Sequence, residues 1–108
     1  MQDVFEELYG VITDRKANPP EGSYTAYLFE KGLDKQLKKL GEETAETIIA
    51  AKNDSDADLI GEISDLLFHL EVVMAQRGIT PDDVAQELRR RSLKTGNLKK
   101  MHVTDKNS

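Results

Sequence analysis

The sequence predicts an all-α fold built as a single bundle of four to five helices. Apolar residues recur every three or four positions through almost the whole chain, which is the spacing of one helix face. No segment shows the strict alternation of a half-buried strand, and the β-branched residues fall inside helical patterns. A chain of 108 residues has room for one hydrophobic core. These observations favour a helical bundle over any fold that contains a sheet.

Residues that break helices divide the first half of the chain into three predicted helices. The first covers residues 2–17 and ends before the proline pair at 19–20, because proline lacks a backbone donor and fixes φ. A short helix is expected at 25–31, with Gly32 at its end. A long helix then follows at 33–53.

The fourth predicted helix, at 56–77, has clear start and stop signals. Ser55 is a good N-cap, and Gly78 ends the pattern. Between residues 66 and 75 this helix is apolar on most sides, so it needs neighbours on most sides. One chain of this length supplies few neighbours. We therefore expect a homodimer that buries the central helices.

The last predicted helix begins with the run Thr-Pro-Asp-Asp at 80–83. This run provides a cap, a proline at the first helical position and acids in the first turn, and the helix is expected to reach about Arg91. The predicted all-α domain is therefore residues 1–92. Residues 93–108 are expected to form a basic, weakly structured C-terminal tail.

Charge is distributed unevenly along the chain. Residues 1–88 carry 19 acidic and 8 basic side chains, whereas residues 89–108 carry 7 basic and 1 acidic. The acidic body would repel a phosphate backbone, so nucleic-acid binding is not expected. The basic tail fits either a solvated or self-paired end, or a segment that folds back near an anionic ligand.

The chain contains no cysteine, which excludes disulfides, thiolate zinc sites and cysteine nucleophiles. No window approaches the roughly 18 apolar residues of a membrane span, and the N-terminus lacks the pattern of a signal peptide. A cytoplasmic protein without a membrane partner is therefore expected.

Four acidic residues on the two long helices are arranged symmetrically about the turn between them. Glu43 and Glu46 lie three apart before the turn, and Glu62 and Asp65 lie three apart after it. In an antiparallel hairpin the two pairs come to nearly the same height, so the carboxylates converge if both face the seam. Repulsion there would force proton uptake unless a cation is bound. Oxygen ligands without thiolate suit Mg²⁺, with Mn²⁺ as an alternative. Acids on a solvated surface would also fit the spacing.

Longer runs around these acids resemble the phosphoribosyl-ATP pyrophosphatases, a family of the MazG-like, all-α nucleoside triphosphate pyrophosphatase superfamily. The superfamily pattern is Glu-Glu-x-x-Glu at 42–46 followed by Glu-x-x-Asp at 62–65. The runs that carry the narrower resemblance are Gly-Ser-Tyr-Thr-Ala-Tyr-Leu-Phe at 22–29, Lys-Lys-Leu-Gly-Glu-Glu-Thr-Ala-Glu at 38–46 and Asp-Leu-Leu-Phe-His-Leu at 65–70. The resemblance covers about residues 3–91. Phe68 departs from the family, which often has tyrosine there.

The resemblance implies a Mg²⁺-dependent homodimer that hydrolyses the α–β phosphoanhydride of phosphoribosyl-ATP. The products would be phosphoribosyl-AMP and pyrophosphate, a step of histidine biosynthesis. Carried over position by position, the metal ligands would be Glu43, Glu46, Glu62 and Asp65, and the catalytic set would add Glu42. Glu42 would either contact a ligand carboxylate or act as a base that orients water.

The substrate's negative charge requires cations close to the carboxylates. Lys39 lies one turn before Glu43 on the same helix face, and Lys35 lies one turn further away. Both lysines also fit ordinary surface positions that pair with nearby acids.

Four further residues are candidates for substrate binding: Ser23, Tyr24, Thr25 and His69. Ser23 or Thr25 offers a hydroxyl for ribose or phosphate, but each also fits a helix cap. His69 follows Asp65 by four residues and fits either a ligand contact or a satisfied interior histidine. Tyr24, like Tyr27 and Phe29, fits core packing or base stacking.

Two other functions remain open at this point. One is a housecleaning pyrophosphatase that acts on free or damaged (deoxy)nucleoside triphosphates. The other is a helical dimerisation module without catalytic activity, whose acids are only surface residues.

Overall fold

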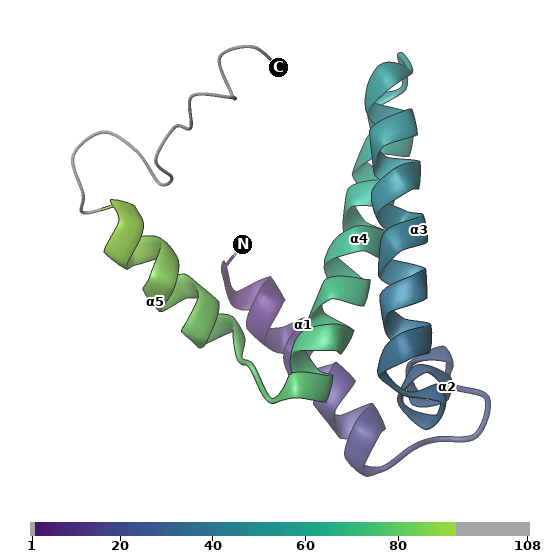
Figure 1. The fold of residues 1–108 in the computed structure, drawn as a ribbon, viewed down its shortest axis with the longest axis vertical. Coiled ribbons are helices and arrows are strands. Elements are labelled where there is room, and N and C mark those ends of the chain that lie inside the picture. The colour runs from purple at the N-terminus through teal and green to yellow at the C-terminus, as the bar shows by residue number, and fades with distance from the viewer. Residues whose placement is uncertain (1, 93–108) are drawn as a thin grey trace.

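Five helices make up residues 2–92, the part of the chain that the structure, a computed structural model, describes (Figure 1). The helices are α1 (Gln2–Ala17), α2 (Tyr24–Lys31), α3 (Leu33–Lys52), α4 (Asp56–Arg77) and α5 (Pro81–Ser92). No strand occurs in these residues, so the predicted all-α class is confirmed. Within the same range, no helix combines the length and the hydropathy that a bilayer crossing needs. The predicted tail at 93–108 lies outside the described residues.

The helix boundaries follow the capping signals closely. The only difference at a helix start is α2, which begins at Tyr24, one residue earlier than predicted. Ser23 is the reason, because its Oγ accepts a hydrogen bond from the backbone N–H of Ala26 at 3.1 Å and so caps the helix. Ser55 caps α4 in the same way through the N–H of Asp58 at 3.2 Å.

Two glycines allow the chain to turn sharply between helices. Gly32 has a φ of 89° and joins α2 directly to α3, while Gly78 has a φ of 72° and ends α4 in the left-handed conformation. The N–H of Ile79 then bonds to the carbonyl of Met74 at 2.9 Å, which satisfies one of the last carbonyls of the helix. A side chain at either glycine would strain the backbone.

The hairpin of α3 and α4 is the main architectural unit, and the other helices gather at its base (Figure 1). There α1 packs on α4 and α2 packs on α3, while α5 contacts α1 and diverges from the hairpin. The buried apolar cluster lies at this base and consists of Ile12, Leu28, Val72 and Ala75. Leu8, Tyr9, Phe29 and Phe68 pack against the cluster.

Beyond this core the hairpin continues with apolar side chains that have no cover. Ile48, Ile49 and Ile60 are 63%, 62% and 64% exposed. They lie on the part of α3 and α4 nearest the connecting turn, away from the base. The described residues of one chain therefore leave an apolar surface on the hairpin unpartnered.

Candidate active site

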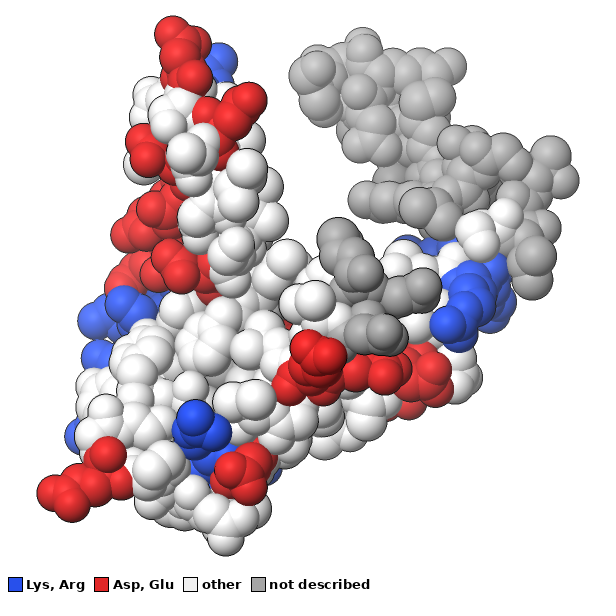
Figure 2. Space-filling model, turned by 180° about the vertical axis from the view of Figure 1, so that it is seen from behind, with Lys and Arg blue, Asp and Glu red and all other residues white. Residues whose placement is uncertain are grey.

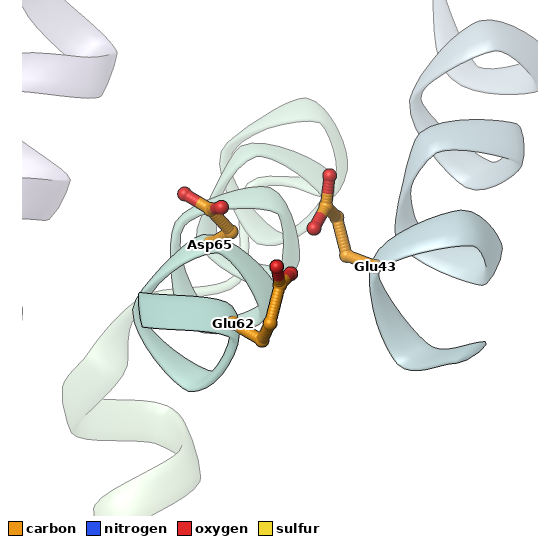
Figure 3. A group of neighbouring side chains, drawn as sticks. All are labelled: Glu43, Glu62 and Asp65. Carbon is orange, nitrogen blue, oxygen red and sulfur yellow. The ribbon is translucent and has the colours of Figure 1, made fainter. Parts of the chain in front are cut away.

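Three of the predicted carboxylates meet where α3 faces α4. Glu43 extends from α3, and Glu62 and Asp65 extend from α4 (Figure 3). One oxygen of each side chain lies within 4.8 Å of the others. The antiparallel hairpin explains the convergence, because residues equally distant from the turn come to the same height. Glu62 and Asp65 share a face of α4, since they are three residues apart.

Glu46, the fourth predicted ligand, is exposed at the edge of this group. The charge of its carboxyl group helps to raise the pKa of both Glu43 and Glu62. The structure therefore places Glu46 beside the group of three. Glu42 points elsewhere: its Oε1 lies 3.5 Å from the Nζ of Lys39.

Burial is the main cause that raises the pKa of Glu43 and of Glu62, and the neighbouring carboxylates raise both further. Glu43 Oε2 and Glu62 Oε2 are buried and have no hydrogen-bond partner within the described residues. A buried carboxylate oxygen without a partner is costly, and a proton or a cation would remove the cost. A set of carboxylate oxygens fits a hard divalent cation such as Mg²⁺ or Mn²⁺.

Thr47 holds the two helices together at the height of the carboxylates. Its Oγ1 lies 2.8 Å from the carbonyl of Glu43 on its own helix and 3.3 Å from the carbonyl of Glu62 on α4. Sequence reasoning missed this residue. Its position four residues after Glu43 indicates only the contact within α3. The second contact depends on how the hairpin packs.

Tyr24 is linked to the backbone of Asp65 through a buried histidine. Its hydroxyl lies 2.9 Å from His69 Nε2, and His69 Nδ1 lies 2.7 Å from the backbone carbonyl of Asp65. A carbonyl only accepts, so Nδ1 carries the proton and Nε2 accepts from the tyrosine hydroxyl. His69 is 5% exposed. It is buried and hydrogen-bonded at both ring nitrogens, and its contact with a ligand stays a prediction.

Basic and acidic side chains occupy successive parts of α3. Lys35, Lys38 and Lys39 precede Glu42, Glu43 and Glu46 along the helix. Figure 2 shows the acidic side chains along one edge of the hairpin and basic side chains directly below them. The pKa of Lys39 is raised, chiefly by Tyr24 and then by Glu42. On this one helix, acidic side chains could hold a metal ion and basic side chains could pair with the phosphates bound to it.

A pocket of about 940 Å³ opens between the end of α1, the loop at 18–23 and α2. Tyr24 and Tyr27 line it, and they are 44% and 37% exposed. Phe29 also lines the pocket and packs against the core cluster. Ser23 lines the pocket while it caps α2, whereas Thr25 is half-buried and does not line it.

The fold and this group of side chains define an all-α protein with a carboxylate centre suited to a hard cation. A family model described as "Phosphoribosyl-ATP pyrophosphohydrolase" matches residues 5–92. The chain belongs to this phosphohydrolase family.

Curated relatives agree with the family match. The chain is 55% identical over 97 residues to a phosphoribosyl-ATP pyrophosphatase of Clostridium novyi, which covers 90% of this chain and 88% of the relative. It is 58% identical over 91 residues to the enzyme of that name from Limosilactobacillus fermentum, with 84% and 85% covered. A histidine biosynthesis bifunctional protein HisIE of Thermoanaerobacter pseudethanolicus is 57% identical over 84 residues, which are 78% of this chain and 39% of that protein.

Proposed function

We propose that the protein hydrolyses phosphoribosyl-ATP to phosphoribosyl-AMP and pyrophosphate in histidine biosynthesis, with Mg²⁺ as its cofactor and Mn²⁺ as a substitute. The observation that carries the proposal is the group formed by Glu43, Glu62 and Asp65, in which two buried oxygens have no partner among the described residues. The relatives' names supply the substrate.

The metal would be held by Glu43, Glu62 and Asp65, with Glu46 at the edge as a further ligand. When bound, such an ion neutralises charge on the phosphate oxygens and acidifies a coordinated water. The fit rests on the donor set, which consists of carboxylates alone, and on the two unpartnered oxygens.

The protein's own side chains would carry the remaining steps. A carboxylate of the group accepts a proton from the attacking water as a new oxygen bond forms to the α-phosphorus. The bond between that phosphorus and the bridging oxygen breaks, and the pyrophosphate leaves with the electron pair. Lys39 and Lys35 stand one and two turns before Glu43 on α3, where their charge favours the leaving phosphates. Glu42 holds Lys39 in place through its 3.5 Å contact.

A second copy of the chain would cover the apolar face of the hairpin. The support for this homodimer is the exposure of Ile48, Ile49 and Ile60, which no described part of the chain covers. The same apolar patch on a symmetry-related copy would bury this surface in a two-fold interface.

The direct test is pyrophosphate release from phosphoribosyl-ATP, measured with Mg²⁺ and after its removal with a chelator. We expect turnover only with the metal, and a melting temperature that rises on Mg²⁺ addition to the free protein. Clear preference for free nucleoside triphosphates would instead identify the protein as a housecleaning pyrophosphatase. Absence of both turnover and a shift in melting temperature would favour the helical dimerisation module without catalytic activity.

A further inference from the structure

Tyr24 and Tyr27 form a partly exposed aromatic surface at the edge of the core. Their rings lie 6.2 Å apart between centroids, with an interplanar angle of 23°. Both line the pocket beside α2, and more than a third of each side chain is open to solvent. Large aromatic groups usually gain stability by being covered, so a parallel exposed pair in a pocket is a good surface for a flat ligand group.

The position of this pair is fixed relative to the carboxylates. The hydroxyl of Tyr24 bonds to His69, and His69 bonds to the backbone of Asp65. Phe68, next to that histidine in the sequence, stacks on Tyr24 at 6.2 Å. The Nζ atoms of Lys31 and Lys35 lie over the ring of Tyr27, 5.8 Å and 6.0 Å from its centroid. The hydrogen bonds therefore tie the aromatic pair to the backbone of a carboxylate residue, and two lysines beside Tyr27 would favour a phosphate on the same ligand.

The charges in the pocket favour a neutral ring over an anion. Glu21 and Glu30 line it together with Arg15 and Lys16. Lys16 is already engaged, since its Nζ donates to the carbonyl of Ala75 at 3.3 Å and lies 5.5 Å from the ring centroid of Phe29. The acids oppose a phosphate, whereas a purine offers a flat π-face and exocyclic N–H donors.

We propose that Tyr24 and Tyr27 are the stacking surface for the purine base of the substrate, and that Tyr27 is the binding residue that fixes the base. The proposal rests on the proposed function, because it assigns the base end of the same substrate. The hydroxyl of Tyr24 is engaged by His69 and its ring stacks on Phe68 and Tyr27, so Tyr24 contributes only the exposed part of its ring. Tyr27 has no such hydrogen bond among the described residues, and its role depends on the ring alone.

The test replaces Tyr27 and separates binding from chemistry. Tyr27→Leu keeps apolar bulk without a π-face, and Tyr27→Phe keeps the π-face without the hydroxyl. We expect KM for phosphoribosyl-ATP to rise about tenfold in Tyr27→Leu, with kcat within about twofold of the parent, since one stacking contact is lost. Tyr27→Phe should behave like the parent. Leu88→Ala, an exposed change on α5, is the control and should leave KM unaltered.

A second measurement uses AMP alone as a probe, by saturation-transfer difference NMR without Mg²⁺. The base protons of AMP should receive saturation from the parent and from Tyr27→Phe, and much less from Tyr27→Leu. Unchanged KM and unchanged transfer in Tyr27→Leu would overturn the proposal while leaving the pyrophosphatase activity in place. A KM increase accompanied by dissociation of the dimer would also overturn it, because the tyrosines would then be subunit contacts. Failure of the proposed function itself would appear separately, as absent turnover in the parent.

Discussion

Glu62 has a buried oxygen without a partner and lies among other carboxylates, so its substitution tests the metal site most directly. Glu62→Gln removes one charge and one metal ligand. We expect kcat/KM to fall by more than about 100-fold, because even the loss of groups that only orient metal ligands costs about 10- to 100-fold. Without Mg²⁺ the melting temperature should stay the same or rise, since repulsion with Glu43 and Asp65 is relieved. Kinetics and thermal melting of the same variant check both effects.

The matched control for this variant is Asp83→Asn on α5. Asp83 Oδ2 accepts from the N–H of Thr80 at 2.9 Å, so this acid belongs to a helix cap. Loss of its charge should cost about 0.5 kcal/mol of stability and leave kcat unaltered. Normal activity in Glu62→Gln, alongside normal activity in Asp83→Asn, would remove the argument for a metal centre.

Glu71 is a second buried acid, outside the carboxylate group. It is 4% exposed, its Oε1 has no hydrogen-bond partner within residues 2–92, and burial raises its pKa to about 7. The folded state therefore holds the proton on Glu71 more tightly than the unfolded state does. The free energy of unfolding is highest below the unfolded pKa of about 4.5, and part of it is lost as the pH rises through 7. Glu71→Gln should therefore stabilise the protein by about 1–3 kcal/mol at pH 8.5 and hardly at all at pH 4.5. Denaturant unfolding at the two pH values measures this. Equal differences between variant and parent at both would show that ionisation is not the cause.

At the scale of residues, spacing in the sequence predicted the convergence of four acids, and the structure brings three of them together while Glu46 stays exposed at the edge. Glu43, Glu62 and Asp65 come together because helical rise and an antiparallel turn determine their heights. The contacts of Thr47 with Glu62 and of Tyr24 with His69 join residues 15 and 45 positions apart. They depend on the rotation of each helix about its axis, which a single sequence does not encode in a readable pattern. The roles of Ser23, Thr25, Lys35 and Lys39 toward substrate stay predictions.

At the scale of elements, α2 is the helix whose position most affects the site, because it carries both tyrosines of the pocket. Helix starts were predictable because Ser55 and Thr80 act through local hydrogen bonds. The start of α2 differed by one residue because two hydroxyls, those of Ser23 and Thr25, were equally plausible caps.

The cap of α2 gives a prediction at this scale. Ser23→Ala removes the acceptor for the N–H of Ala26 and should lower stability by about 1 kcal/mol. It should also raise KM, because α2 frays where Tyr24 begins. Ser23→Asn keeps a capping oxygen and should restore both values. A stable Ser23→Asn protein with poor turnover would instead show that the serine hydroxyl contacts substrate.

At the scale of the whole molecule, the hairpin extends beyond the core that α1, α2 and α4 form at its base (Figure 1). The all-α class followed from periodicity alone. The position of α5, which contacts α1 and diverges from the hairpin, did not follow from the sequence, because this helix buries none of its residues within the described chain.

The proposed dimer makes a prediction for the intact protein. Light scattering coupled to size exclusion should give about twice the chain mass of 12.1 kDa. Ile60→Asp places a charge on the apolar face of α4 and should shift the protein to monomer. Gln86→Asp, at an exposed polar position on α5, should leave the mass of the dimer intact. A monomeric parent, or a dimer that tolerates Ile60→Asp, would place the subunit contact elsewhere or remove it.

The chain has three tyrosines and no tryptophan, and two of the tyrosines lie in the pocket. Near-ultraviolet emission of the unlabelled protein therefore originates largely from the place where ligands are expected. Mg²⁺ and pyrophosphate do not absorb at those wavelengths, so an optical titration with either would report a change at the carboxylates that reaches Tyr24 through its bond to His69 and the bond of His69 to Asp65.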